Sequence, residues 1–311
     1  MRSTTASTLI QRFSTGIVTP DFQYPEEIDM TKKYEFIEND TKFFNGKTLR
    51  RIRALIDVRD GVKAGDLGGY LESEKNLSSQ GQCWVSDVAY VYESARVSGN
   101  ALVYGRAAVF GQAQVSDDAK VFGDAEIRDR ALIADDATVY GRALVSGSAR
   151  LFQQALVYGT AEISGKVVMD ERAVARDNVT ICDSVHMSGH SMACGYAHIE
   201  GNARIMDESV VYGDVAIGGA TVLRDCARVS PEHPVILAGP ISHKGGYMTI
   251  HRDDLTGARI NSSLIDDFSG SRDEALKYIE NILSDTPEKY RMSQFAMMSA
   301  MLSAAETCVL S

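Results

Sequence analysis

The segment Val103-Tyr104-Gly105-Arg106-Ala107-Ala108 is one unit of a six-residue repeat that runs from Cys83 to Ser230 without an insertion. The first position of the unit is apolar in all 25 repeats. Its members are Val85, Val91, Val97, Val103, Val109, Val115, Val121, Ile127, Ile133, Val139, Val145, Leu151, Val157, Ile163, Met169, Ala175, Ile181, Met187, Ala193, Ile199, Ile205, Val211, Ile217, Leu223 and Val229. A strict short period of this kind indicates a solenoid, in which each unit packs only against its neighbours.

Two further positions of the unit are restricted. The residue four places after the apolar one is small throughout, and 17 of its 24 members from Ala89 to Ala227 are alanine. The residue two places after the apolar one is Gly or Asp in 21 of 24 units, and only Glu93, Gln153 and Glu171 depart from this rule. Because Gly and Asp tolerate left-handed backbone angles, this position predicts a tight corner in every unit.

Each unit therefore predicts one short strand followed by one corner. Strand side chains alternate between two faces, so the Val91 and Ala95 classes point inward, whereas Tyr92, Arg96 and their equivalents point outward. Three successive units close one triangular coil. Residues 83–230 then make about eight coils and a rod of roughly 40 Å. A helix is excluded because a period of six places successive apolar residues roughly 240° apart.

The repeat resembles the left-handed β-helix of the hexapeptide-repeat transferase superfamily, and this resemblance implies the left-handedness. Upstream, the segment Leu49-Arg50-Arg51-Ile52-Arg53-Ala54-Leu55-Ile56 and the segment Val62-Lys63-Ala64-Gly65-Asp66-Leu67-Gly68-Gly69-Tyr70 resemble the YdcK-type family, which includes phage-encoded relatives and is described as an acetyltransferase family. The resemblance covers about residues 30 to 260 and implies an all-β fold, a single-stranded left-handed parallel β-helix.

The rest of the chain divides into an extension and two caps. We expect a flexible N-terminal extension over residues 1–29, an N-terminal cap over residues 30–82, the β-helix over residues 83–230, and an α+β cap with two helices over residues 231–311. Asn45-Gly46 predicts a β-hairpin turn within the N-terminal cap. A solenoid needs such caps because each end otherwise exposes an open apolar coil.

The C-terminal cap has signals for both of its helices. Ser271-Arg272-Asp273-Glu274 is a capping box that opens a helix to about Leu283. Thr286-Pro287-Glu288 opens a second helix that runs to about Glu306. An apolar stripe on the second helix, formed by Phe295, Met298, Met301, Leu302 and Ala305, is expected to cover the last coil or to pack against another subunit.

Composition restricts the partners and the compartment. The net charge of -10 argues against a nucleic-acid partner, although an acidic mimic of DNA remains an alternative. No apolar run approaches the length of a membrane span. Five cysteines without C-x-x-C spacing indicate neither a disulfide framework nor a zinc site, and we expect a cytoplasmic protein without a cofactor or metal.

Residues 1–29 leave the compartment open to a second interpretation. Eight of the residues from Met1 to Pro20 are Ser or Thr, and no acidic residue precedes Asp21. This composition is typical of export segments and is compatible with a secreted bacterial effector. The other interpretations are a disordered tail and translation from an upstream start codon, since Met30 is also a possible initiator methionine.

One histidine is the candidate for catalysis. The superfamily resemblance implies a His general base between the subunits of a trimer, acetyl-CoA as the acyl donor, and an insertion loop, which this repeat lacks. His190 occupies a corner, and the equivalent positions one coil before and one coil after it are Arg172 and Glu208. Glu208 could orient the imidazole and raise its pKa, whereas Arg172 opposes that shift, and a solvated corner is the alternative. His186 and His198 point outward, where the rod offers them no partner but solvent or another subunit.

An aromatic ladder is the candidate interface. Tyr104, Phe122, Tyr140 and Tyr158 recur once per coil, just after the apolar position. Stacked outward rings form an apolar strip, which favours a homotrimer with the ladder at its interface. The alternatives are stacking within one chain and stacking against a sugar or nucleotide ligand.

Three functions are compatible with these features. The first is a non-catalytic structural or binding protein, which presents a rigid rod to a protein partner or to itself. The second is an acyl-CoA-dependent acyltransferase with His190 as base. The third is a secreted effector or anti-defence protein built on the same scaffold.

Overall fold

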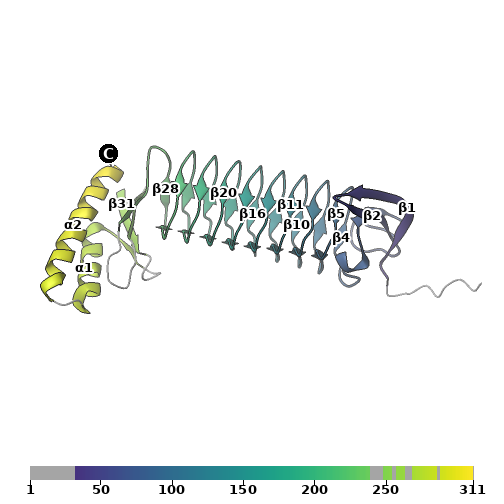
Figure 1. The fold of residues 1–311 in the computed structure, drawn as a ribbon, viewed down its shortest axis with the longest axis horizontal. Coiled ribbons are helices and arrows are strands. Elements are labelled where there is room, and N and C mark those ends of the chain that lie inside the picture. The colour runs from purple at the N-terminus through teal and green to yellow at the C-terminus, as the bar shows by residue number, and fades with distance from the viewer. Residues whose placement is uncertain (1–31, 239–247, 254–256, 263–267, 286–287, 311) are drawn as a thin grey trace, which may run out of the picture.

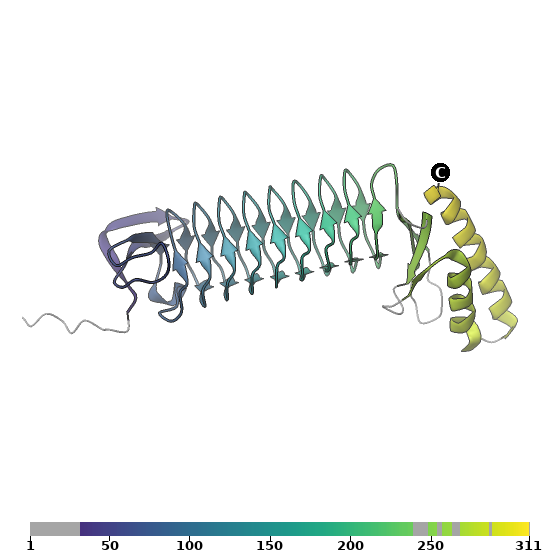
Figure 2. The same ribbon diagram turned by 180° about the vertical axis from the view of Figure 1, so that it is seen from behind.

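The structure is a computed structural model of the 311-residue chain, and it describes residues 32–238, 248–253, 257–262, 268–285 and 288–310. It is a left-handed parallel β-helix with a β cap at the N-terminal end and an α+β cap at the C-terminal end (Figure 1). The view from behind shows the same straight rod (Figure 2). The predicted fold class is therefore confirmed, whereas the predicted extension over residues 1–29 lies outside the described residues.

Each repeat unit forms one short strand, and each strand pairs in parallel with the strand three units further along the chain. Val121 lies in register with Val103 and with Val139, for example. The three resulting faces of the rod are named here the ladder face, the hairpin face and the third face. The rod strands of the ladder face are β4 (Trp84–Val85), β7 (Leu102–Val103), β10 (Lys120–Val121), β13 (Thr138–Val139), β16 (Leu156–Val157), β19 (Val174–Ala175), β22 (Met192–Ala193), β25 (Val210–Val211) and β28 (Ala227–Val229).

The other two faces carry eight rod strands each. Those of the hairpin face are β5 (Tyr90–Val91), β8 (Ala108–Val109), β11 (Glu126–Ile127), β14 (Leu144–Val145), β17 (Glu162–Ile163), β20 (Thr180–Ile181), β23 (His198–Ile199) and β26 (Ala216–Ile217). Those of the third face are β6 (Arg96–Val97), β9 (Gln114–Val115), β12 (Leu132–Ile133), β15 (Arg150–Leu151), β18 (Val168–Met169), β21 (His186–Met187), β24 (Arg204–Ile205) and β27 (Val222–Leu223).

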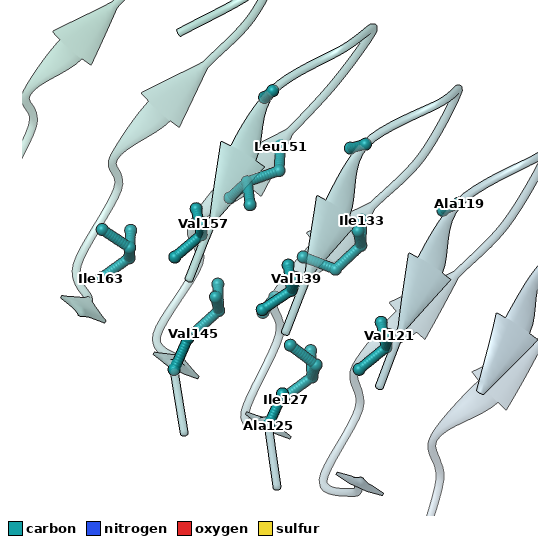
Figure 3. Packing of buried hydrophobic residues seen from close by; sticks show 14 of the residues in the cluster. Ala119, Val121, Ala125, Ile127, Ile133, Val139, Val145, Leu151, Val157 and Ile163 are labelled. Atoms are coloured by element: carbon teal, nitrogen blue, oxygen red, sulfur yellow. The ribbon is translucent and has the colours of Figure 1, made fainter. Parts of the chain in front are cut away.

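The predicted inward positions form the core. Figure 3 shows the side chains of Val121, Val139 and Val157 in one column inside the coil, and all three are fully buried. The small residues between the columns, such as Ala119 and Ala125, are also buried. Burial of each large aliphatic side chain stabilises the fold by about 1.5–3 kcal/mol, so the columns supply most of the hydrophobic stabilisation.

Corners whose residue is Asp, Glu or Gln are held by a hydrogen bond that the sequence pattern does not show. Asp129 has a φ of 60°, and its Oδ2 accepts a hydrogen bond of 2.9 Å from the backbone N–H of Gly147 on the next coil. Gln153, with a φ of 52°, accepts the N–H of Glu171 in the same way at 2.6 Å. Glu93 accepts the N–H of Gly111 at 2.9 Å. Two of the three departures from the Gly/Asp rule therefore make the same bond as Asp.

The N-terminal cap extends the hairpin face. It contains β1 (Tyr34–Phe44), β2 (Lys47–Ala54), β3 (Leu67–Leu71) and the 3-10 helix η1 (Glu74–Asn76). The predicted hairpin turn is confirmed, because β1 and β2 pair antiparallel around Asn45-Gly46 and both turn residues have positive φ. Strand β3 pairs in parallel with β5. The cap thus lies in register with the first coil.

The cap affects the first coils in two ways. A bridge between Leu77 and Val97 joins the cap to the third face, so the rod has about nine coils rather than eight. Tyr92 points outward from the coil as predicted, but the cap hairpin covers it, so that it is only 1% exposed. Its ring stacks on Phe110 at 4.9 Å and contacts Phe44 of the hairpin, and its hydroxyl accepts a hydrogen bond from Asn45. The outward placement of Tyr92 is therefore confirmed, and the hairpin accounts for its burial.

The C-terminal cap is a small antiparallel sheet covered by two helices. It comprises β29 (Ile236–Ala238), β30 (Met248–Asp253), β31 (Gly257–Ser262), β32 (Ser269–Gly270), α1 (Arg272–Ile282), the 3-10 helix η2 (Leu283–Asp285) and α2 (Glu288–Leu310). The predicted capping box is confirmed, since Ser271 accepts the N–H of Glu274 and Glu274 accepts that of Ser271. Pro287 lies outside the described residues.

The antiparallel sheet, rather than the helical stripe, supplies the contacts to the last coil. Met298 and Leu302 of α2 pack with Met248 and Ile260 of the sheet. Thr249 accepts the backbone N–H of Val222 at 2.8 Å, and Asn261 donates to the carbonyl of Val222 at 3.1 Å. Buried polar side chains thereby satisfy backbone groups that the last coil would otherwise leave unpaired.

We predict that Val139→Asp is severely destabilising. The substitution buries a carboxylate in an apolar column, at a cost of several kcal/mol, on the order of 3 or more. Thr138→Asp is the matched control, because Thr138 is the neighbouring residue of the same strand and is partly exposed. Thermal unfolding of both variants tests the assignment, and equal melting temperatures would contradict it.

We also predict that Ser191→Ala and Ser209→Ala raise stability. Both hydroxyls are fully buried, and neither has a hydrogen-bond partner among the described residues. Both serines occupy the small position, where alanine is the commonest residue. Replacing an unpaired buried hydroxyl should stabilise each variant by about 1 kcal/mol. Urea unfolding measures this gain, and a loss of stability would show that the hydroxyls have partners in solution.

Candidate functional site

His190 lies at an exposed corner of the rod, as predicted, and its partner is an arginine. Nη1 of Arg172 lies 3.3 Å from Nε2 of His190, and Nε of the same arginine donates to Gln154 at 3.0 Å. A guanidinium has only donors, so Nε2 of His190 would be the acceptor in a hydrogen bond between these two groups. Arg172 thus lies beside the ring nitrogen that a general base would use.

Glu208 is not paired with His190. Its side chain lies 3.9 Å from the sulfur of Cys226, and its carbonyl accepts a hydrogen bond from Arg228. Within the part of the chain that the structure describes, no hydrogen bond joins Glu208 to His190. The structure therefore brings His190 together with Arg172 and not with the carboxylate that would make it a stronger base.

The corner around His190 forms an open groove of about 560 Å³. It is lined by Asp135, Asp136, Gln153, Gln154, Glu171, Arg172, Gly189 and His190. All of these residues come from successive coils at the same corner. The groove offers polar groups of both charges to a ligand, but its charged side chains are exposed to solvent, where ion pairs contribute little.

The other two histidines of the rod have partners within the chain. Nε2 of His186 lies 3.0 Å from Oδ2 of Asp170, and Nε2 of His198 lies 3.2 Å from Oε2 of Glu200. The expectation that the rod offers them no partner is therefore wrong. Asp170 is a diagonal neighbour of His186 on the adjacent coil, and Glu200 follows His198 on the same outward side of one strand.

The aromatic ladder is a continuous stack. Ring centroids lie 4.7, 4.9 and 4.9 Å apart along Tyr104, Phe122, Tyr140 and Tyr158, with interplanar angles of 9°, 2° and 2°. Burial raises the pKa of Tyr104, and Asp87 adds to that shift. Burial likewise raises the pKa of Tyr140, with a smaller contribution from Tyr158. The rings thus cover each other's faces and leave their edges exposed.

The ladder belongs to the most apolar face of the rod. Besides the rings, the outward positions of the ladder face carry Leu102, Leu156, Val174, Met192, Cys194, Val210 and Tyr212, interrupted by Lys120, Thr138, Arg176 and Arg228. The equivalent positions of the third face are more polar: Arg96, Gln114, Arg150, Asp170, His186 and Arg204 stand among apolar residues such as Leu132, Phe152 and Val168. Apolar side chains therefore gather along one face, beyond the four rings that the sequence spacing identified.

A further cluster escaped the sequence analysis. The potential ligand atoms of Cys182, His198 and Glu200 all lie within 4.8 Å of one another on the hairpin face. These three residues are the only group of this kind found among the described residues. Their spacing along the chain matches no linear metal motif, so only the coil register could have revealed the cluster.

Comparisons with known proteins name no family for the chain. It matches no protein-family model, and a search of curated proteins finds no similar sequence. Among the helices in the described ranges, none combines the length and apolar character needed to cross a membrane.

Proposed function

We propose that the chain is a non-catalytic structural or binding protein of the hexapeptide-repeat kind, whose rod associates with further copies of itself through the ladder face. The observation that carries this proposal is the concentration of half-buried apolar and aromatic side chains on that face. Apolar strips of this extent are typical of protein interfaces, since a monomer gains nothing from leaving them in water.

A second copy is the partner that fits this face best. The rings repeat once per coil, at 4.7 to 4.9 Å, along the rod axis. A partner that fills every gap between the outward side chains needs the same repeat along its own axis. Another copy of this rod has the same repeat along its axis. In a closed symmetric oligomer the ladder face of every subunit is buried.

A homotrimer is the arrangement that we propose. A triangular prism presents three flat faces around its long axis, which suits threefold packing about an axis parallel to the rod. The resemblance to the hexapeptide-repeat superfamily supports the same number of subunits. Two aromatic ladders from neighbouring subunits would then pack their exposed ring edges together near the axis.

The corner around His190 favours this non-catalytic function over the acyltransferase alternative. A general base needs a ring nitrogen that is free to accept a proton from substrate. Nε2 of His190 is instead within hydrogen-bonding distance of the Arg172 guanidinium. The repeat also has no insertion loop that could form a pocket for an acyl acceptor.

We predict that Phe122→Lys combined with Tyr140→Lys dissociates the assembly. In a trimer the two substitutions place six like charges around the axis where rings are packed, and such charges repel in a desolvated interface. Light scattering coupled to size-exclusion chromatography should change from the mass of a trimer to that of a monomer.

The matched control places lysines on the third face. Leu132→Lys combined with Phe152→Lys replaces one aliphatic and one aromatic outward residue and adds the same charge. This variant should keep the mass of the assembly. A monomeric unmodified protein at micromolar concentration, or equal dissociation of both variants, would overturn the proposal.

Titration calorimetry with acetyl-CoA separates the non-catalytic function from the acyltransferase alternative. We predict no saturable binding to the unmodified protein. Saturable binding would instead support the acyltransferase alternative, which requires acetyl transfer that is lost in His190→Ala. A secretion reporter fused to residues 1–29 tests the effector alternative independently, because it reads export rather than assembly or binding.

A further inference from the structure

Two adjacent coils of the hairpin face bring three potential metal ligands together. Strands β20 and β23 pair in parallel, with Thr180 opposite His198. One residue further along, the backbone N–H of Cys182 donates to the carbonyl of Ile199 at 2.9 Å. Cys182 and Glu200 therefore occupy the same position on successive coils. His198 and Glu200 flank the buried Ile199, so both side chains project from the same side of the strand.

The distances suit a single ion. Nε2 of His198 lies 3.2 Å from Oε2 of Glu200, and all three ligand atoms lie within 4.8 Å of one another. Tetrahedral zinc with bonds of about 2.0–2.3 Å separates its ligand atoms by roughly 3.3–3.8 Å. The upper limit of 4.8 Å is about 1 Å longer than these separations, so binding an ion requires the side chains to close around it.

The charge around the cluster favours a cation. The carboxylate of Glu200 lies within 4.8 Å of the other two ligand atoms, and Asp183 follows Cys182 directly in the chain. Negative side chains at this point of the face favour a cation over an anion.

We propose that Cys182, His198 and Glu200 form a zinc site. A thiolate, an imidazole and a carboxylate are the three ligand types that Zn²⁺ takes in proteins, whereas Mg²⁺ and Ca²⁺ prefer oxygen alone. Three protein ligands leave the fourth position of the ion for water or for a group from a bound molecule. On the next coil, Ala216 lies in register with His198 and Gly218 lies against Glu200, so the described residues on that side of the cluster have small side chains or none.

Zinc titration of the full-length protein tests this site. Isothermal calorimetry with Zn²⁺ alone should give one ion per chain. Cys182→Ser and His198→Gln should each weaken binding by about tenfold or more, as expected for the loss of a direct ligand. The matched control is His186→Gln, because His186 is also paired with a carboxylate, Asp170, but belongs to no such ligand group among the described residues. Zinc affinity should be unchanged in this control.

Cobalt substitution reports the thiolate directly. Co²⁺ should give a sulfur-to-metal charge-transfer band that disappears in Cys182→Ser and persists in Cys194→Ser, which alters a thiol on the ladder face. Melting curves confirm that each variant is folded. Absence of zinc binding, or binding that survives both Cys182→Ser and His198→Gln, would overturn the site.

Discussion

The structure depends on one constraint, the parallel register that sets each residue beside its equivalent on the preceding coil. Backbone hydrogen bonds between coils enforce this register along the whole rod, as in the pairs Val103 to Val121 and Val121 to Val139. Each side chain therefore lies at strand spacing from the side chain at the same position of the next coil, and the two can pack or form a hydrogen bond. Columns of valine, stacks of aromatic rings and chains of corner hydrogen bonds are all consequences of this arrangement.

The register explains how much of the fold could be predicted. The inward positions follow from the period alone, because a column tolerates only apolar or small side chains. The burial of Tyr92 could not be predicted from the repeat, because it comes from Phe44 in the cap hairpin, which does not follow the six-residue period. The corner bonds were missed for a different reason. Gln153 departs in residue type from the Gly/Asp rule, yet it offers the same acceptor to the coil above.

The candidate sites show where linear spacing is insufficient. The interval of one coil correctly placed Arg172 beside His190, but it could not decide which of two neighbours the imidazole would contact. His186 and Asp170 are separated by 16 residues rather than 18, so they are diagonal neighbours on adjacent coils. Whether such diagonal side chains meet depends on their length and direction, which the period does not give. Cys182 and Glu200 occupy the same position on adjacent coils, whereas His198 and Glu200 are two residues apart on one coil. Linear metal motifs, which describe ligands on helices and turns, do not include this arrangement.

The uniform core means that function must be sought on the outward positions. Every coil buries the same kinds of side chain, so the core distinguishes neither one coil nor one face from another. The outward residues do differ, since the ladder face is apolar and the hairpin face carries the cysteine cluster. Corners separate the faces, and the ladder and the cysteine cluster lie on different faces. Self-association on one face is therefore compatible with metal binding on another.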